Sequence, residues 1–237
     1  MSVQIKCPKF MQVGKNAHHQ VGDIVNDLGC RKPLIITDTT MVGLGYVDKV
    51  KQQFSSDFGL IEVFDETIPE PTEASIKAAV ELVKQGQFDC LIAIGGGSPI
   101  DSAKAISVLS VFGGEMRDYK FPHIQKLAGL PVIAIPTTAG TGSEVTKFTI
   151  ITDQDTDEKM LCAGPAYVPA AAIIDYTLTL SLPPRTTADT GIDALTHAIE
   201  AYVSKKANPF SDSQALAAIK LIAPNLRTAF THGDNEA

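Results

Sequence analysis

The chain has 237 residues, of which 44% are hydrophobic and 20% are charged, and its formal net charge is −7. This hydrophobic content supports a packed core and argues against disorder. The acidic balance, without any run rich in Lys or Arg, argues against nucleic acid and anionic membranes as partners, because both require a basic face.

The sequence also bears on where the protein acts. No apolar run reaches the roughly 20 residues that a bilayer span requires, and the first residues, MSVQIKCPKF, lack the apolar core of a signal peptide. We therefore expect a cytoplasmic protein. The four cysteines are widely spaced and form no C-x-x-C pair. They indicate small buried thiols rather than a disulfide framework or a thiolate zinc site.

Apolar runs of strand type alternate with helical patterns over most of the chain. A helix is expected at 16–29 and another at 71–86, with Thr72 as its N-cap and Gly86 as its stop. This alternation predicts an α/β domain with a parallel sheet covered on both faces. The expected strands are PLIIT (33–37), GLIEVF (59–64), DCLIAI (89–94), PVIAI (131–135), FTIIT (148–152) and AAIID (171–175).

The pattern changes after LSLPPR (180–185), where no further strand is indicated. Two long helical patterns follow, at about 186–204 and 209–229. We place a domain boundary at Pro183–Pro184, which divides the chain into an α/β domain at 1–183 and a helical domain that begins at 184 and runs to 237.

A glycine triplet marks the strongest candidate site, in LIAIGGGSPIDSAKAIS (91–107). A strand is expected to end at the triplet and a helix to open after it, with Ser98 as N-cap, Pro99 at the first helical position and Asp101 completing a capping box. Three glycines let backbone N–H groups approach an anion closely, and the helix N-terminus adds a partial charge of about +0.5. This stretch predicts a pyrophosphate cradle.

Two further loops follow predicted strands. In PVIAIPTTAGTGSEVT (131–146), small hydroxyl residues offer donors to a phosphate or a carboxamide, although an ordinary polar loop has the same composition. In PLIITDTT (33–40), Asp38 could accept both hydroxyls of an adenosine ribose, which would favour NAD over NADP; a turn-capping role is the alternative.

Within GIDALTHAIEAYV (191–203), Asp193 and His197 lie four residues apart and so share a helix face. A carboxylate and an imidazole suit Fe²⁺, Zn²⁺ or Mn²⁺, but taken alone this spacing is more often that of a hydrogen-bonded surface pair. Two protein ligands are too few for such a site. No other histidine is a clear third ligand, since His18 and His19 are expected on the solvent side of the first helix.

The segments GGGSPIDSAKA, PTTAGTGSEVT and TGIDALTHAIEAYVS, in this order, resemble the iron-containing (group III) alcohol dehydrogenases. The resemblance implies a Rossmann-like nucleotide-binding domain followed by an all-helical metal-binding domain, and a reversible hydride transfer between NAD(P) and a small alcohol or aldehyde. It also implies Fe²⁺, with Zn²⁺ as the alternative, and a homo-oligomer such as a dimer.

Carried over residue by residue, the resemblance gives Asp38 a ribose contact and gives Asp193 and His197 the role of catalytic metal ligands, two of four. It places Lys159 at the nucleotide cleft and Leu178 near the adenosine. The pyrophosphate and the rest of the nucleotide would contact Gly95, Gly96, Gly97, Ser98, Thr137, Thr138, Thr141, Ser143 and Val145.

The chain departs from the family in two ways. Glu70 in PEPT stands where the family usually has Asn. The family chain also continues past residue 237 with two further histidine ligands, so this sequence resembles a truncated member, with apolar surface exposed on the helices at 186–204 and 209–229. Two other functions therefore remain open: an NAD-binding chain without turnover, and a zinc-dependent relative of the glycerol dehydrogenase type.

Overall fold

The structure is a computed structural model, and it describes residues 3–234. Its chain divides into two compact units. The sheet unit contains residues 6–137 and 143–175, and the helical unit contains residues 3–5, 138–142 and 176–234. Each unit is described by itself below.

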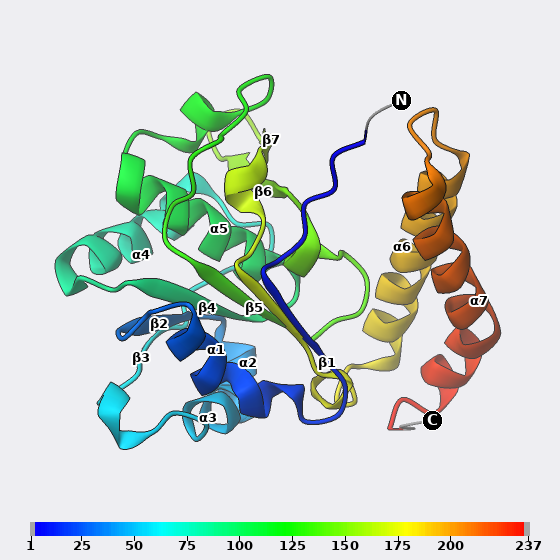
Figure 1. The fold of residues 1–237 in the computed structure, drawn as a ribbon, viewed down its shortest axis with the longest axis horizontal. Coiled ribbons are helices and arrows are strands. Elements are labelled where there is room, and N and C mark those ends of the chain that lie inside the picture. Colours follow the sequence, from blue (N-terminus) through cyan, green and yellow to red (C-terminus); the bar gives the residue numbers. More distant parts are fainter. Residues whose placement is uncertain (1–2, 235–237) are drawn as a thin grey trace. The chain divides into compact units, whose positions relative to one another are not determined.

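A parallel sheet of six strands forms the centre of the sheet unit, in the order β1-β8-β5-β4-β2-β3 (Figure 1). Every neighbouring pair in it is parallel, as the alternating sequence pattern predicts. The inner strands β2, β4 and β5 are buried at every residue, which their apolar runs require. The strands are β1 (Phe10–Val13), β2 (Pro33–Ile36), β3 (Glu62–Phe64), β4 (Cys90–Gly95), β5 (Val132–Pro136) and β8 (Ala171–Ile174).

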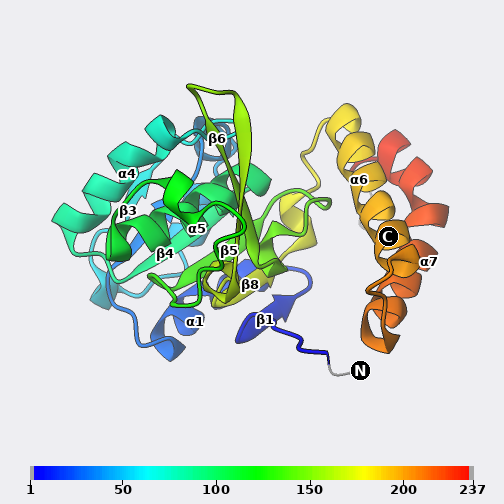
Figure 2. The same cartoon turned by 90° about the horizontal axis from the view of Figure 1, so that it is seen from above.

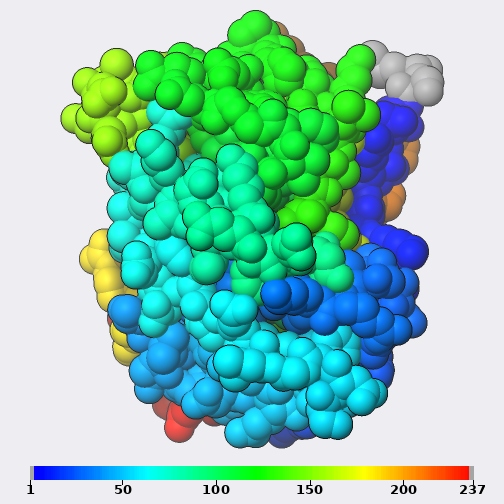
Figure 3. Space-filling view, turned by 90° about the vertical axis from the view of Figure 1, so that its left-hand side faces the viewer, coloured from blue at the N-terminus to red at the C-terminus, as the bar shows by residue number. Residues whose placement is uncertain are grey.

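Helices cover both faces of this sheet. In Figure 1, α4 (Glu73–Gly86) and α5 (Gly97–Phe112) lie above the strands, and Figure 2 shows the same two helices from above. Below the strands in Figure 1 are three shorter helices. Figure 3 shows the teal residues of α4 between the green segment that follows α5 and the blue and cyan residues around the shorter helices. Those helices are α1 (Val21–Asp27), α2 (Thr39–Gly43) and α3 (Tyr46–Lys51).

The helix α4 begins where the sequence predicts. Thr72 accepts a hydrogen bond from the backbone of Ser75, and the Ser75 side chain accepts one from the Thr72 backbone, which makes a capping box. Gly86 is the last helical residue rather than the stop itself, because Gln87 takes the left-handed conformation at φ 53°. Burial of the apolar stripe, which includes Ile76 and Val83, contributes about 1.5–3 kcal/mol for each large side chain.

The predicted strand at 148–152 exists, but it lies outside the parallel sheet. It is β6 (Phe148–Asp153), which pairs antiparallel with β7 (Glu158–Ala163). Its residues alternate between exposed and buried positions, as in an antiparallel hairpin with only one face packed on the core, instead of being buried throughout. The two strands are joined by a turn in which Asp157 has φ 54°.

The helical unit contains a pair of long helices, α6 (Pro184–Val203) and α7 (Pro209–Thr231), which lie side by side in both Figure 1 and Figure 2. Asn208 caps α7 by accepting from the backbone N–H groups of Phe210 and Ser211. Both helices expose large apolar side chains, and Val203 and Leu221 are 71% and 67% exposed, which confirms the predicted apolar surface. No helix within residues 3–234 is long and apolar enough to cross a membrane.

Candidate functional site

The carboxyl ends of β2, β4 and β5 meet at one edge of the parallel sheet. Thr37, which follows β2, donates its hydroxyl to the carbonyl of Ile94 at 2.8 Å, and the N–H of Thr137 donates to the carbonyl of Gly95 at 2.9 Å. The loops that follow these three strands are therefore neighbours. Ligands of open α/β sheets bind at this edge, so the predicted residues Asp38, Gly95 and Thr137 lie where a nucleotide would be expected.

The glycine triplet makes the sharp turn from β4 into α5. Gly95 has φ 146°, and a Cβ placed on it would lie 2.6 Å from Cγ of Pro99, so no other residue can replace it without strain. The chain enters the helix earlier than predicted. Gly96 is the N-cap and the helix begins at Gly97, so the expected cap at Ser98 is wrong.

The predicted capping box at Asp101 is also wrong. The Asp101 carboxylate turns away from the helix start and accepts from the hydroxyl of Ser143 and, at 3.0 Å, from the N–H of Ile150. These partners lie 42 and 49 residues away in the sequence. These distant contacts outweigh the local capping preference, because the carboxylate is largely buried and needs protein donors in place of water.

The first amides of α5 are therefore left without a side-chain cap, since no side chain within residues 3–234 accepts from them. By contrast, side-chain oxygens cap α4 and α7. Gly96, Gly97 and Ser98 are all half-buried. Uncapped N–H groups and the positive end of a helix of 16 residues together bind anions. This turn has the partly exposed N–H donors that a diphosphate requires.

Asp38 caps α2, since its Oδ1 accepts from the N–H of Met41 at 3.0 Å. The side chain is half-buried, and the described residues supply no hydrogen bond to Oδ2. The capping role that the sequence left open is thus present. The second carboxylate oxygen is still available for a ribose hydroxyl.

The other candidate nucleotide contacts are divided between the two units. Thr137 and Ser143 are buried in the sheet unit, with Val145 half-buried beside Ser143 in a short 3-10 helix. Within the helical unit, the segment 138–142 contacts α6, because a Cβ on Gly140 would lie 2.8 Å from Cβ of Thr190. The candidates in the helical unit are Thr138 and Thr141, in this segment, and Leu178, which is fully buried.

Lys159 lies on β7 and pairs with Glu70, with 2.6 Å between Nζ and Oε1. Both side chains are mostly exposed, so this pair contributes little to stability. Glu70 has φ 53°, a conformation that Asn adopts more readily than Glu. The structure therefore places Lys159 against Glu70, and any contact of Lys159 with a nucleotide requires the ammonium to leave that carboxylate.

The predicted metal ligands Asp193 and His197 lie on one face of α6, with 3.4 Å between Oδ1 and Nε2. Their side chains are 45% and 59% exposed. An oxygen and a nitrogen this close can both reach one divalent ion at about 2.1 Å. The donor set suits such an ion, but no third His, Cys, Asp or Glu of residues 3–234 joins the pair.

A different group of potential ligands, Cys30, Asp89 and Cys90, lies in the sheet unit at the amino end of β4. The Asp89 carboxylate already accepts from the N–H groups of Arg31 and Lys32, at 2.6 and 2.9 Å. The hydrogen bond to Cys30, together with burial, raises the pKa of the Cys90 thiol. A protonated thiol is a poor metal ligand, so this group is explained as a tie between the start of β2 and the start of β4.

The prediction that His18 faces solvent is wrong. His18 is buried, and its Nδ1 lies 2.5 Å from Oδ2 of Asp175, which follows β8. The exposed neighbour His19 is on the solvent side, as expected. Since the position of His18 depends on a partner 157 residues away, the helical pattern alone gave no signal for it.

This combination of a parallel sheet and an uncapped glycine turn is typical of dinucleotide-binding α/β proteins. The profile of iron-containing alcohol dehydrogenase matches residues 8–176, and that of the Fe-containing alcohol dehydrogenase family, C-terminal, matches residues 187–237. The chain belongs to the iron-containing alcohol dehydrogenase family. The predicted Rossmann-like sheet domain followed by the start of a helical domain is thereby confirmed.

Long-chain-alcohol dehydrogenase 1 of Geobacillus thermodenitrificans is 42% identical to this chain, over 100% of it and 60% of that protein. The crystal structure of 1,3-propanediol oxidoreductase matches with a TM-score of 0.93 and 34% identity, over 99% of this chain and 62% of that one. Sulfoacetaldehyde reductase from Bifidobacterium kashiwanohense, in complex with NAD⁺, matches with a TM-score of 0.93 and 32% identity, over 100% and 62%. The chain thus spans about 60% of the length of the curated relative.

Proposed function

We propose that the protein is an NAD-dependent alcohol dehydrogenase that transfers a hydride between the nicotinamide and a small alcohol or aldehyde, with a divalent metal, Fe²⁺, at Asp193 and His197. The uncapped start of α5 behind the glycine turn carries this proposal. The sulfoacetaldehyde reductase of the same fold in complex with NAD⁺ supports it.

In this proposal the chain binds and orients the cofactor. The amides at Gly97 and Ser98 hold the diphosphate, and Asp38 Oδ2 accepts from the adenosine ribose. Thr137, Thr138, Thr141, Ser143, Val145, Lys159 and Leu178 are proposed to line the rest of the nucleotide.

The metal pair would hold the ion through Asp193 Oδ1 and His197 Nε2. When bound, the ion supplies Lewis acidity to the alcohol oxygen, and the nicotinamide supplies or accepts the hydride. Zn²⁺ has the same ligand preferences, so a zinc-dependent relative of the glycerol dehydrogenase type remains an alternative.

The metal part is tested with His197→Ala. After anaerobic reconstitution with Fe²⁺, we expect the wild-type chain to retain iron by elemental analysis and to oxidise NADH when a short aldehyde is added. The iron content of His197→Ala should be lower than that of the wild type by about tenfold or more, because one of the two proposed protein ligands is lost. The variant should still bind NADH.

The exposed His19→Ala provides the control, since it removes a histidine of the sheet unit that is not one of the pair. Iron retention that is equal in wild type and His197→Ala would contradict the metal assignment. NADH binding without any aldehyde-dependent oxidation in the wild type would support the other function that the sequence left open, a nucleotide-binding chain without turnover.

The cofactor preference is tested with Asp38→Asn. We expect the ratio of the NADP⁺ Kd to the NAD⁺ Kd to fall about tenfold, because the carboxylate that repels a 2′-phosphate is neutralised. The melting temperature should not change, since Asn caps a helix as well as Asp does. Titration calorimetry with NADP⁺ and with NAD⁺ measures the two Kd values. An unchanged ratio in a variant that binds both would show that Asp38 does not contact the ribose.

The proposal also includes the oligomeric state, the cellular location and the division into domains. We propose a dimer, supported by the exposed apolar side chains of α6 and α7, and a cytoplasmic location, supported by four free cysteines. The division into a nucleotide-binding domain at 1–183 and the beginning of a metal-binding domain at 184–237 also remains a proposal.

A further inference from the structure

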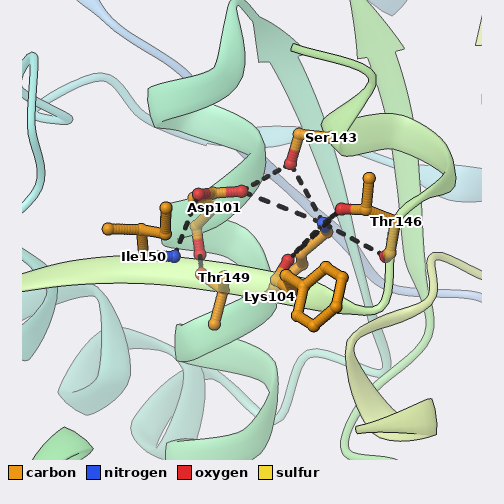
Figure 4. Close-up of polar contacts among 7 residues, drawn as sticks. Asp101, Lys104, Ser143, Thr146, Thr149 and Ile150 are labelled. Atoms are coloured by element: carbon orange, nitrogen blue, oxygen red, sulfur yellow. Dashed lines mark hydrogen bonds and ion pairs between the residues drawn. The ribbon is translucent and has the colours of Figure 1, made fainter. Parts of the chain in front are cut away.

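A buried lysine joins α5 to the segment that follows the polar loop. Lys104 is 2% exposed, and its Nζ lies within hydrogen-bond distance of Ser143 Oγ (3.0 Å), of Thr146 Oγ1 (3.1 Å) and of the Phe148 carbonyl (2.7 Å). Figure 4 shows these acceptors gathered around the ammonium. The three N–H donors of a lysine thus all have partners on a single segment, 143–148.

Asp101 completes this arrangement from the preceding turn of the same helix. One carboxylate oxygen accepts from the Ser143 hydroxyl and lies 3.8 Å from Nζ of Lys104, while the other accepts from the Ile150 N–H. The Asp101 carbonyl accepts from the hydroxyl of Thr149 at 2.9 Å. Residues 143–150 are therefore held to α5 by both side chains (Figure 4).

The network lies close to the start of α5. Asp101 is four residues beyond Gly97, which is about 6 Å along a helix. Because Ser143 is hydrogen-bonded to Asp101, Ser143 lies about one helical turn from the uncapped amides. The segment that Lys104 holds thus begins near the proposed diphosphate position.

The charge of Lys104 is costly to bury. Burial lowers its pKa to about 8, against the attraction of Asp101 and Glu144, from a reference value of 10.5. A folded-state pKa below that of the unfolded chain means that the protonated lysine destabilises the folded state at neutral pH, and that stability rises as the pH increases from about 8 to about 10.5. The acceptors on 143–148 offset the cost of burying this charge, so the attachment of that segment to α5 depends on the ammonium.

We propose that Lys104, held by Asp101, is a positioning residue for the cofactor: it fixes residues 143–148 on α5 and so sets the place of Ser143 and Val145 beside the bound dinucleotide. This inference rests on the proposed function. Lys104 itself is enclosed by its partners and does not touch the cofactor.

The test measures NADH binding by fluorescence titration, with Lys104→Met and Thr146→Val as variants. Thr146→Val removes the hydroxyl that accepts from Lys104 and keeps the size of the side chain. This variant therefore tests the proposal if Lys104→Met does not fold. At about pH 7 we expect Lys104→Met to raise the NADH Kd about tenfold and Thr146→Val to raise it about threefold, as residues that act through others do. The exposed Lys84→Met, on α4, should leave the Kd unchanged.

Two readouts separate positioning from a general structural role. The wild-type Kd should rise between about pH 7 and about pH 9.5, as the ammonium facing Asp101 and Glu144 loses its proton, whereas Lys104→Met should show no such rise. Hydrogen exchange at the amides of 143–150 should be faster in Lys104→Met than in the wild type, with no change in α4.

Folded variants that bind NADH like the wild type, with the same pH profile, would overturn the inference. If the wild type itself does not bind NADH, the proposed function fails, and the exchange measurement alone then decides whether Lys104 fixes this segment. Unchanged exchange at 143–150 would overturn it in that case as well.

Discussion

Replacing Gly96 by Val is expected to weaken NADH binding by about a hundredfold or more and to leave the fold intact. Gly96 has φ −74° and ψ −158°, which valine can also adopt. We expect a branched side chain at the N-cap to obstruct the approach of a diphosphate to the amides of Gly97 and Ser98. Two hydrogen bonds to a charged diphosphate are then lost, each worth about 1.5–3 kcal/mol. Titration calorimetry measures the affinity, and thermal unfolding measures the fold.

A matched control is Gly43→Val, at the end of α2, where an added Cβ would meet nothing within 4 Å. That variant should bind NADH like the wild type. If Gly96→Val binds NADH with unchanged affinity while both variants remain folded, the dinucleotide does not lie on the start of α5, and the dehydrogenase proposal loses its main support.

Asp175→Ala is expected to lower the free energy of unfolding by about 3 kcal/mol. Asp175 is 1% exposed, and its carboxylate accepts from the N–H groups of Asn16 and His18 at 3.2 and 3.3 Å and contacts the His18 ring. Removing it leaves the buried His18 N–H and ring without their acceptor, and each such loss costs about 1–3 kcal/mol, whereas the exposed Asn16 N–H can turn to water. Urea denaturation measures the change.

Asp155→Ala serves as its comparison, because Asp155 is exposed in the hairpin turn and should change the free energy by less than about 0.5 kcal/mol. The double variant with His18→Ala should show a coupling of at least about 1 kcal/mol. A loss of less than about 0.5 kcal/mol for Asp175→Ala would contradict the account of this buried pair.

The elements that the sequence predicted well are those with local causes. The Thr72 cap of α4 depends on neighbours within one turn, and the inner strands β2 and β4 are apolar at nearly every residue. The strands that the sequence did not reveal lack such signals. β1 lies at the sheet edge and is mostly exposed, and β7 begins with the charged pair Glu158 and Lys159.

In the candidate site, too, features with local causes could be predicted and features that depend on distant residues could not. The Gly95 turn was predictable, because a strand followed by glycines and a helix allows few alternatives. The role of Asp101 was not, since its partners Ser143 and Ile150 become neighbours only when the chain folds. Burial of Lys104 was hidden for the same reason: its place in the helical pattern does not reveal the carbonyl groups that surround it.

The most direct test is hydrogen exchange at the amides of Gly97 and Ser98, with and without saturating NADH. These N–H groups have no side-chain cap within the described chain, so they should exchange quickly in the free protein and slow markedly when a diphosphate accepts from them. Slower exchange at these two amides, with little change at α4, is the predicted result. Saturable NADH binding that leaves their exchange unchanged would contradict the account.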